Sequence, residues 1–207
     1  MRLHKAVSAA LAAYLTLTFS VGQVVATDND DRRWDPQQWD KYNYSPCYYF
    51  EADFPAGDAR SRISNGRSLW NSVGRELWFG NRAPCSHATH AAIKVNWNDL
   101  LVPFNDDWAF VNNDHLGDIS DSTVNFNASP DKSGGGVWSW YWGTGEPTGK
   151  VDGWSVAGHE FGHAVALGHT EQSTSDLMYP YINVGQKKRA LTAHDKASIG
   201  ALYAVAR

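Results

Sequence analysis

Residues 151–180 read VDGWSVAGHEFGHAVALGHTEQSTSDLMYP, and this segment carries the strongest structural signal in the chain. Within it, His159, Glu160 and His163 form an H-E-x-x-H pattern, which puts both histidines on one face of a helix, one turn apart. Their imidazoles are thereby placed to bind one zinc ion. Catalytic zinc usually takes a third protein ligand and keeps the fourth position for water. His169 is the candidate for that third ligand.

The position of His169 predicts where this helix ends. At about 100° per residue, a helix would carry His169 to the wrong side for a shared metal, so the helix has to end before it. Gly168 directly precedes His169, and glycine ends helices because it adopts a left-handed backbone without steric cost. At the other end of the helix, Asp152 is a natural N-cap.

HEFGHAVALGH, followed by STSDLMYP at residues 173–180, resembles the matrixin branch of the metzincin metallopeptidases. The family pattern is H-E-x-x-H-x-x-G-x-x-H with a downstream Met-turn. The resemblance implies one catalytic zinc ion, bound by His159, His163 and His169. It also implies that Glu160 is the general base and that Met178 is the Met-turn residue, an apolar floor beneath the metal site.

One position departs from the family pattern, because the glycine of the motif falls on Ala166. If this residue had to adopt a left-handed backbone, alanine would cost roughly 1–2 kcal/mol. Two alternatives stay open: Gly168 takes over the turn, or Ala166 turns without a positive φ. The departure concerns the placement of the third ligand and leaves the first two histidines and the base untouched.

The predicted chemistry is peptide hydrolysis through a zinc-bound water. Zinc held by three neutral imidazoles keeps its full charge, lowers the pKa of bound water from about 15.7 to about 7 and polarises a carbonyl oxygen. Glu160 is rotated about 100° from His159, so it can face that water without binding the metal. It would take the proton and deliver it to the leaving amine. Two other classes stay open: a secreted binding module with a remnant zinc site, and a zinc hydrolase of non-protein substrates.

The rest of the sequence predicts an exported single-domain protein. Residues 1–26 have basic residues, an apolar run too short for a comfortable membrane span and a small-residue cleavage site, as in a secretory signal peptide. Residues 27–46 form a polar tail, and residues 47–207 form one catalytic domain. We expect a secreted, extracellular monomer that acts on protein or peptide substrates. The formal charge of −4 gives no reason to expect nucleic acid or a membrane as partner.

Cys47 and Cys85 are the two cysteines of the chain, and an even count in an exported protein favours a disulfide between them. Matrixins commonly carry a propeptide cysteine that blocks the zinc, but Cys47 lies in SPCYYF without the expected Pro-Arg-Cys-Gly surroundings. We therefore expect no cysteine-switched zymogen. The short chain, without a haemopexin-like repeat, is interpreted as a microbial member of the family.

The resemblance implies an α/β (α+β) fold in which a twisted, mostly parallel five-stranded sheet with one antiparallel edge strand packs on two long helices. A further helix follows the Met-turn. Hydrophobic periodicity predicts strands at residues 47–52, 91–97 and 122–127 and a helix at residues 59–77. By resemblance, residues 122–127 are the edge strand that borders the cleft, and residues 191–203 are the closing helix.

The start of the closing helix has a capping-box-like pattern at Thr192 and Asp195. The family usually has two adjacent acids here, and His194, which we take as a surface residue, replaces the first of them. A carboxylate network under the active site would therefore be altered. Five acidic residues could bind calcium, although a solvated acidic loop is the favoured alternative: Asp106, Asp107, Asp114, Asp118 and Asp121.

Two segments bear on the substrate cleft. Trp138, Trp140 and Trp142 share one face if their segment is extended, and they form either a wall of the cleft or a cover over the sheet. Residues 181–190 would, by resemblance, form the outer wall of the pocket for the side chain that follows the scissile bond. Three charged residues of this wall are expected to be solvated rather than to determine specificity: Lys187, Lys188 and Arg189.

Overall fold

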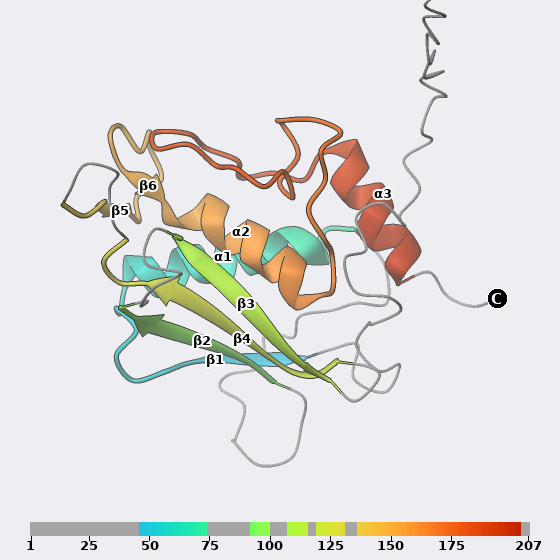
Figure 1. Ribbon diagram of the computed structural model, residues 1–207, viewed down its shortest axis with the longest axis horizontal. Coiled ribbons are helices and arrows are strands. Elements are labelled where there is room, and N and C mark those ends of the chain that lie inside the picture. The colour runs from blue at the N-terminus through green and yellow to red at the C-terminus, as the bar shows by residue number, and fades with distance from the viewer. Residues whose placement is uncertain (1–45, 74–91, 100–106, 116–118, 131–135, 204–207) are drawn as a thin grey trace, which may run out of the picture.

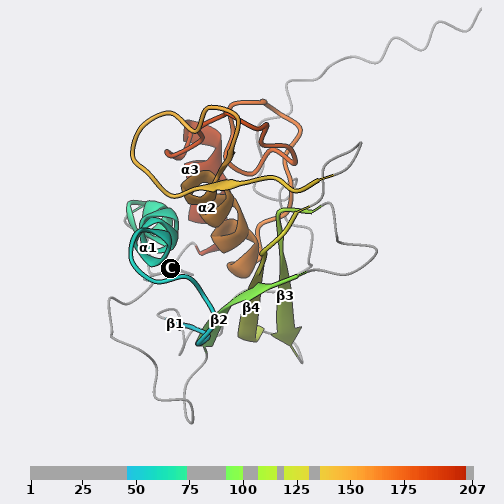
Figure 2. The same ribbon diagram turned by 90° about the vertical axis from the view of Figure 1, so that its left-hand side faces the viewer.

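The structure, a computed structural model, describes residues 46–73, 92–99, 107–115, 119–130 and 136–203. The elements follow in the order β1 (Cys47–Phe50), α1 (Asp58–Asn71), β2 (Ala92–Asn98), β3 (Ala109–His115), β4 (Ile119–Asn127), β5 (Trp140–Tyr141), β6 (Val151–Asp152), α2 (Gly153–Ala164) and α3 (Ala193–Leu202). Figures 1 and 2 show α1 and α2 side by side on one face of the sheet. The expected mixed α/β class is confirmed.

The sheet has the order β1-β2-β4-β3 in the part of the chain that the structure describes. β1 pairs parallel with β2, and β2 pairs parallel with β4. β3 pairs antiparallel with β4, so the predicted mostly parallel sheet with an antiparallel edge is confirmed over these four strands.

The assignment of residues 122–127 as the edge strand is wrong. These residues belong to β4, which lies between β2 and β3, and β3 is the antiparallel edge strand. The physical reason is visible in their burial, since Val124 and Phe126 on one face and Asn125 and Asn127 on the other are all almost inaccessible to water. A strand that is buried on both faces is central. The sequence pattern does not predict β3, because its polar residues 112–114 break the alternation of apolar and polar residues expected of a half-buried strand.

The two central helices approach each other closely. A Cβ atom on Gly66 of α1 would lie 2.6 Å from the backbone nitrogen of Gly158 in α2. The indole nitrogen of Trp70 donates a 2.8 Å hydrogen bond to the carbonyl oxygen of Gly158. The sheet side of the core is filled by Ile93, Val95, Val124 and Phe126. The active-site helix is thereby fixed between α1 and the sheet.

All three tryptophans near β5 are partly buried and pack against the core, and two of them cover the sheet. Trp140 and Trp142 stack with their ring centroids 5.3 Å apart and an interplanar angle of 13°. Both rings contact Phe126, and the indole nitrogen of Trp140 donates to the carbonyl oxygen of Asn127. For these two residues the prediction of a cover over the sheet is confirmed.

The predicted capping box of α3 is present, with Thr192 and Asp195 exchanging both hydrogen bonds. In the described ranges, no helix has the length and apolar character needed to cross a membrane. The predicted signal peptide (1–26), residues 27–45 of the predicted tail (27–46) and the disulfide partner Cys85 lie outside the described residues, as do Asp106 and Asp118.

Candidate metal centre

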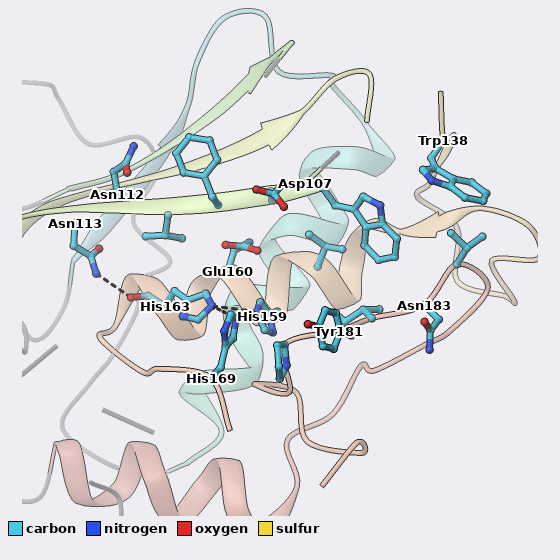
Figure 3. A pocket seen from close by; sticks show the side chains of 18 residues that line it. Asp107, Asn112, Asn113, Trp138, His159, Glu160, His163, His169, Tyr181 and Asn183 are labelled. Atoms are coloured by element: carbon cyan, nitrogen blue, oxygen red, sulfur yellow. Dashed lines mark hydrogen bonds between the residues drawn. The ribbon is translucent and has the colours of Figure 1, made fainter. Parts of the chain in front are cut away.

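The metal site starts from α2, whose first turn is fixed by its N-cap. The Asp152 carboxylate accepts hydrogen bonds from the backbone nitrogen and the hydroxyl group of Ser155, as the sequence predicted for an N-cap residue. The helix continues through His159, Glu160 and His163 and ends at Ala164. The four-residue spacing therefore places both imidazoles on the same helical face, towards the cleft (Figure 3).

The turn towards His169 is made by Ala166, which has a φ of 71°. Both sequence alternatives are therefore wrong: Ala166 is itself left-handed, and Gly168 is not. The backbone nitrogens of Ala166 and Leu167 donate to the carbonyl oxygens of His163 and Gly162, the two bonds of a Schellman motif. Ala166 is also buried in the core. These bonds and this packing hold a conformation that alanine alone disfavours.

The three histidines converge on one point. Their Nε2 atoms form an almost equilateral triangle with sides of 3.1, 3.1 and 3.2 Å. The Nδ1 atoms of His159 and His163 lie 2.7 Å from the carbonyl oxygens of Leu177 and Leu167. Because a carbonyl oxygen can only accept, each Nδ1 carries the proton and each Nε2 presents a lone pair.

Zinc fits this triangle. Tetrahedral zinc with Zn–N bonds of about 2.0–2.1 Å separates its ligand nitrogens by about 3.3 Å, close to the observed sides. Lone pairs that face each other at this distance repel unless a cation lies between them. Within the described ranges, His159, His163 and His169 form the one group of three or more potential metal ligands. Of the five acidic residues considered for calcium, the structure describes the side chains of Asp107 and Asp121, and Asp121 accepts a hydrogen bond from the backbone nitrogen of Ala92.

Burial sets the protonation of the groups around the triangle. Loss of water contact lowers the pKa of His159 to about 4, with smaller contributions from the charges of His169 and Lys188. Burial, with a smaller contribution from the nearby charge of Asp107, raises the pKa of Glu160 to about 8. The Glu160 Oε2 atom is buried and has no hydrogen-bond partner among the described residues. A carboxyl group in this state can exchange a proton near neutral pH.

Met178 lies directly beneath α2, where a Cβ atom on Gly162 would come within 2.2 Å of its sulfur. The backbone nitrogens of Leu177 and Met178 donate to the Asp195 carboxylate at 3.0 and 3.2 Å. The carbonyl oxygen of Leu177 in turn accepts the proton of His159. Asp195 thus holds the segment that orients the first ligand.

The prediction that His194 is a surface residue is wrong. Its side chain is only 13% exposed, and its Nδ1 atom lies 3.1 Å from a carboxylate oxygen of Asp176. The other oxygen of Asp176 accepts a hydrogen bond from the Thr192 hydroxyl group at 2.7 Å. The altered carboxylate network expected from the sequence therefore joins Asp176, Thr192, His194 and Asp195.

Two of the three basic residues in the wall, Lys188 and Arg189, are not solvated, contrary to the prediction. The Lys188 ammonium group donates to the carbonyl oxygens of Asp176 and Tyr181. Arg189 forms two hydrogen bonds with the fully buried Asp152 carboxylate. Their partners lie up to 46 residues away in the sequence, so the local pattern QKKR carries no signal for this burial.

The metal centre opens into a cleft of about 1000 Å³. Residues 107–113 line one side and residues 180–184 line the other, with α2 between them. Figure 3 shows the histidines towards one end of the cleft, and Trp138 and Asn183 towards the other. Trp138 therefore fits the prediction of a cleft wall, which fails for the other two tryptophans of its segment.

Three imidazole nitrogens that converge beside a buried carboxylate, on the floor of an open cleft, define a zinc-dependent hydrolase. The matrixin peptidase family model matches residues 30–204, and the chain belongs to this family. Matrixins are zinc metallopeptidases that act on proteins or peptides and are generally extracellular.

One relative is metalloendoproteinase 2-MMP of Arabidopsis thaliana, which is 46% identical over 56 residues. The matched residues make up 27% of this chain and 15% of the length of that relative. The likeness to this relative is therefore local, whereas the family match extends over most of the chain.

Proposed function

We propose that this chain is a secreted zinc-dependent endopeptidase. The observation that carries the proposal is the triangle of Nε2 atoms with 3.1–3.2 Å sides, open to a cleft and flanked by Glu160. His159, His163 and His169 would hold the zinc ion. When bound, the ion supplies Lewis acidity, which acidifies water and polarises the carbonyl group of the scissile bond.

Glu160 is the general base of the proposed reaction. Its carboxyl group lines the cleft between β3 and the histidines (Figure 3), so it can take a proton from water and deliver it to the leaving amine. Met178 would be the Met-turn residue and would keep the floor of the site apolar.

The substrate would be an extended peptide. Among the described strands, β3 pairs with β4 alone. Residues 107–113, which lead into β3 and include its first part, line the cleft. A peptide can extend such an edge through backbone hydrogen bonds. Residues 180–184 would enclose its side chains from the opposite side, with Tyr181 and Trp138 as large apolar surfaces.

Export through the predicted signal peptide, residues 1–26, and a bond between Cys47 and Cys85 belong to the same proposal. Secreted protein should begin near Thr27 and have the intact mass of an oxidised chain that lacks two hydrogens. An N-terminus at Met1 in the secreted fraction, or two alkylatable thiols, would contradict these two parts.

The test of the activity compares Glu160→Gln with wild type and with Glu171→Gln, the same change at an exposed site. Zinc content is measured alongside casein hydrolysis, before and after 1,10-phenanthroline. We expect one zinc per chain in all three proteins, with hydrolysis reduced by about 10²–10⁴-fold only in Glu160→Gln.

Other outcomes separate the alternatives. Bound zinc without cleavage of casein or gelatin by the wild type would support the binding module. Cleavage of a polysaccharide alone would support the non-protein hydrolase. Normal proteolysis by Glu160→Gln would remove Glu160 from the mechanism.

A further inference from the structure

Lys188 is a buried lysine that follows the cleft wall in the sequence, only 6% exposed. Its Nζ atom donates to the carbonyl oxygen of Asp176 at 3.0 Å and to that of Tyr181 at 3.2 Å. It also lies 5.0 Å from the centroid of the Tyr179 ring. Burial lowers the pKa of Lys188, while the charges of Asp195 and Asp176 raise it. Burying an ammonium group is unfavourable, so its contacts have to compensate for the loss of water.

The two carbonyl oxygens bracket a short stretch that serves the metal centre. Between Asp176 and Tyr181 lie Leu177, whose carbonyl oxygen orients His159, and Met178, which lies beneath α2. The Asp195 carboxylate binds the nitrogens of Leu177 and Met178. Asp195 thus holds the beginning of this stretch, and Lys188 bridges its beginning and its end.

Residues 181–184 form the outer wall of the cleft, and they belong to no helix or strand. Further along, the nitrogen of Gly185 donates to the carbonyl oxygen of Lys150 at 2.9 Å. The nitrogen of Lys188 donates to the Ser155 hydroxyl group at 2.7 Å, which anchors the lysine to α2. Lys188 therefore ties the wall to α2 through its backbone nitrogen and to the metal-site segment through its side chain.

We propose that Lys188 is a positioning residue for substrate selection, because its bonds to the carbonyl oxygens of Asp176 and Tyr181 fix the wall that encloses a substrate side chain next to the cleaved bond. The inference rests on the proposed endopeptidase function. It assigns to Lys188 no contact with the substrate and no role in proton transfer.

The adjacent lysine provides a matched control. Lys187 pairs with Glu146 at the surface, where that glutamate is 69% exposed. Lys188→Met removes the donors and keeps an unbranched apolar side chain, and Lys187→Met makes the same change on the outside. Lys188→Arg keeps the charge and the donors, which tests whether the bonds rather than the lysine itself are required.

Two measurements are made on the zinc-loaded proteins. The first is hydrogen exchange of the backbone amides of residues 179–186, which reports the mobility of the wall whether or not the protein is active. The second is kcat/KM for two peptides that differ only in Leu or Ala directly after the cleaved bond. For Lys188→Met, we expect exchange about tenfold faster and a Leu-to-Ala selectivity ratio about fivefold to tenfold lower than in wild type.

We expect Lys187→Met to match wild type and Lys188→Arg to retain most of the selectivity. Unchanged exchange in Lys188→Met would overturn the proposal. Faster exchange with an equal loss on both peptides would also overturn it, because Lys188 would then stabilise the wall without selecting substrates. If wild type cleaves neither peptide nor casein, the proposed function fails, whereas the exchange comparison still decides whether Lys188 holds the wall.

Discussion

Asp195 is the residue whose removal should disturb both the fold and the metal site. Its carboxylate is fully buried and accepts three backbone N–H bonds, from Leu177 at 3.0 Å, Met178 at 3.2 Å and Thr192 at 2.8 Å. A buried donor without an acceptor costs about 1–3 kcal/mol, so Asp195→Ala should lower the free energy of unfolding by about 3–6 kcal/mol. For a domain of this size, that corresponds to a melting temperature roughly 6–20 °C lower.

Zinc affinity should fall with stability, because Asp195 fixes the segment whose Leu177 carbonyl oxygen orients His159. Loss of such support typically weakens metal binding by about 10–100-fold. Circular dichroism melts and competition with a chromophoric chelator measure the two effects, and Lys196→Ala at the neighbouring exposed site is the control. A melting temperature within about 3 °C of wild type, with zinc affinity within about threefold, would refute the reasoning.

Three further changes test the electrostatics and the aromatic residues. In metal-free protein, the pKa of Glu160 is raised to about 8, so the folded state binds more protons than the unfolded state up to that pH. The free energy of unfolding should therefore fall by about 2 kcal/mol from pH 6.5 to 8. Denaturant titrations measure this fall, and Glu160→Gln should not show it. Arg189→Met leaves the Asp152 carboxylate without its cation and should lower the free energy of unfolding by about 3 kcal/mol in the same assay. Lys187→Met, at the exposed pair, should lower it by less than about 1 kcal/mol. Equal effects would contradict a stabilising role for the buried pair. Trp138→Ala should raise KM several-fold with little change in melting temperature. Trp140→Ala should lower the free energy of unfolding by about 3–5 kcal/mol. If Trp138→Ala were the more destabilising change, Trp138 would be the structural residue of the two.

The sequence predicted those features of the site that depend on local geometry. The spacing of His159 and His163, the N-cap at Asp152 and the capping box at Thr192 each involve residues within one or two helical turns. Helix geometry alone relates such residues, so their arrangement follows from the sequence without knowledge of the rest of the fold. His169 was predicted correctly as a neighbour of the other two histidines, although by a different turn from either alternative considered.

Features that depend on remote partners were missed. The burial of Lys188 and Arg189 depends on acceptors at Asp176 and Asp152, and no periodicity links these positions in the sequence. β3 was missed for a related reason, because its pairing with β4 determines it more than its own residue pattern does. The left-handed Ala166 belongs here too, since tertiary packing overrides its intrinsic preference.

At Gly66, α1 lies so near α2 that an added Cβ atom would come within 2.6 Å of the backbone nitrogen of Gly158, and no residue of α1 lines the cleft. The spacing between the two helices is therefore set by a position that lacks a side chain rather than by an interlocking pair of side chains. Even a methyl group at Gly66 would force α2, and with it two of the three ligands, towards the opposite wall. Substitutions at Gly66 should consequently be tolerated less well than its distance from the histidines suggests. A variant there that lost activity would have lost it through displacement of α2 and not through a change in the catalytic groups.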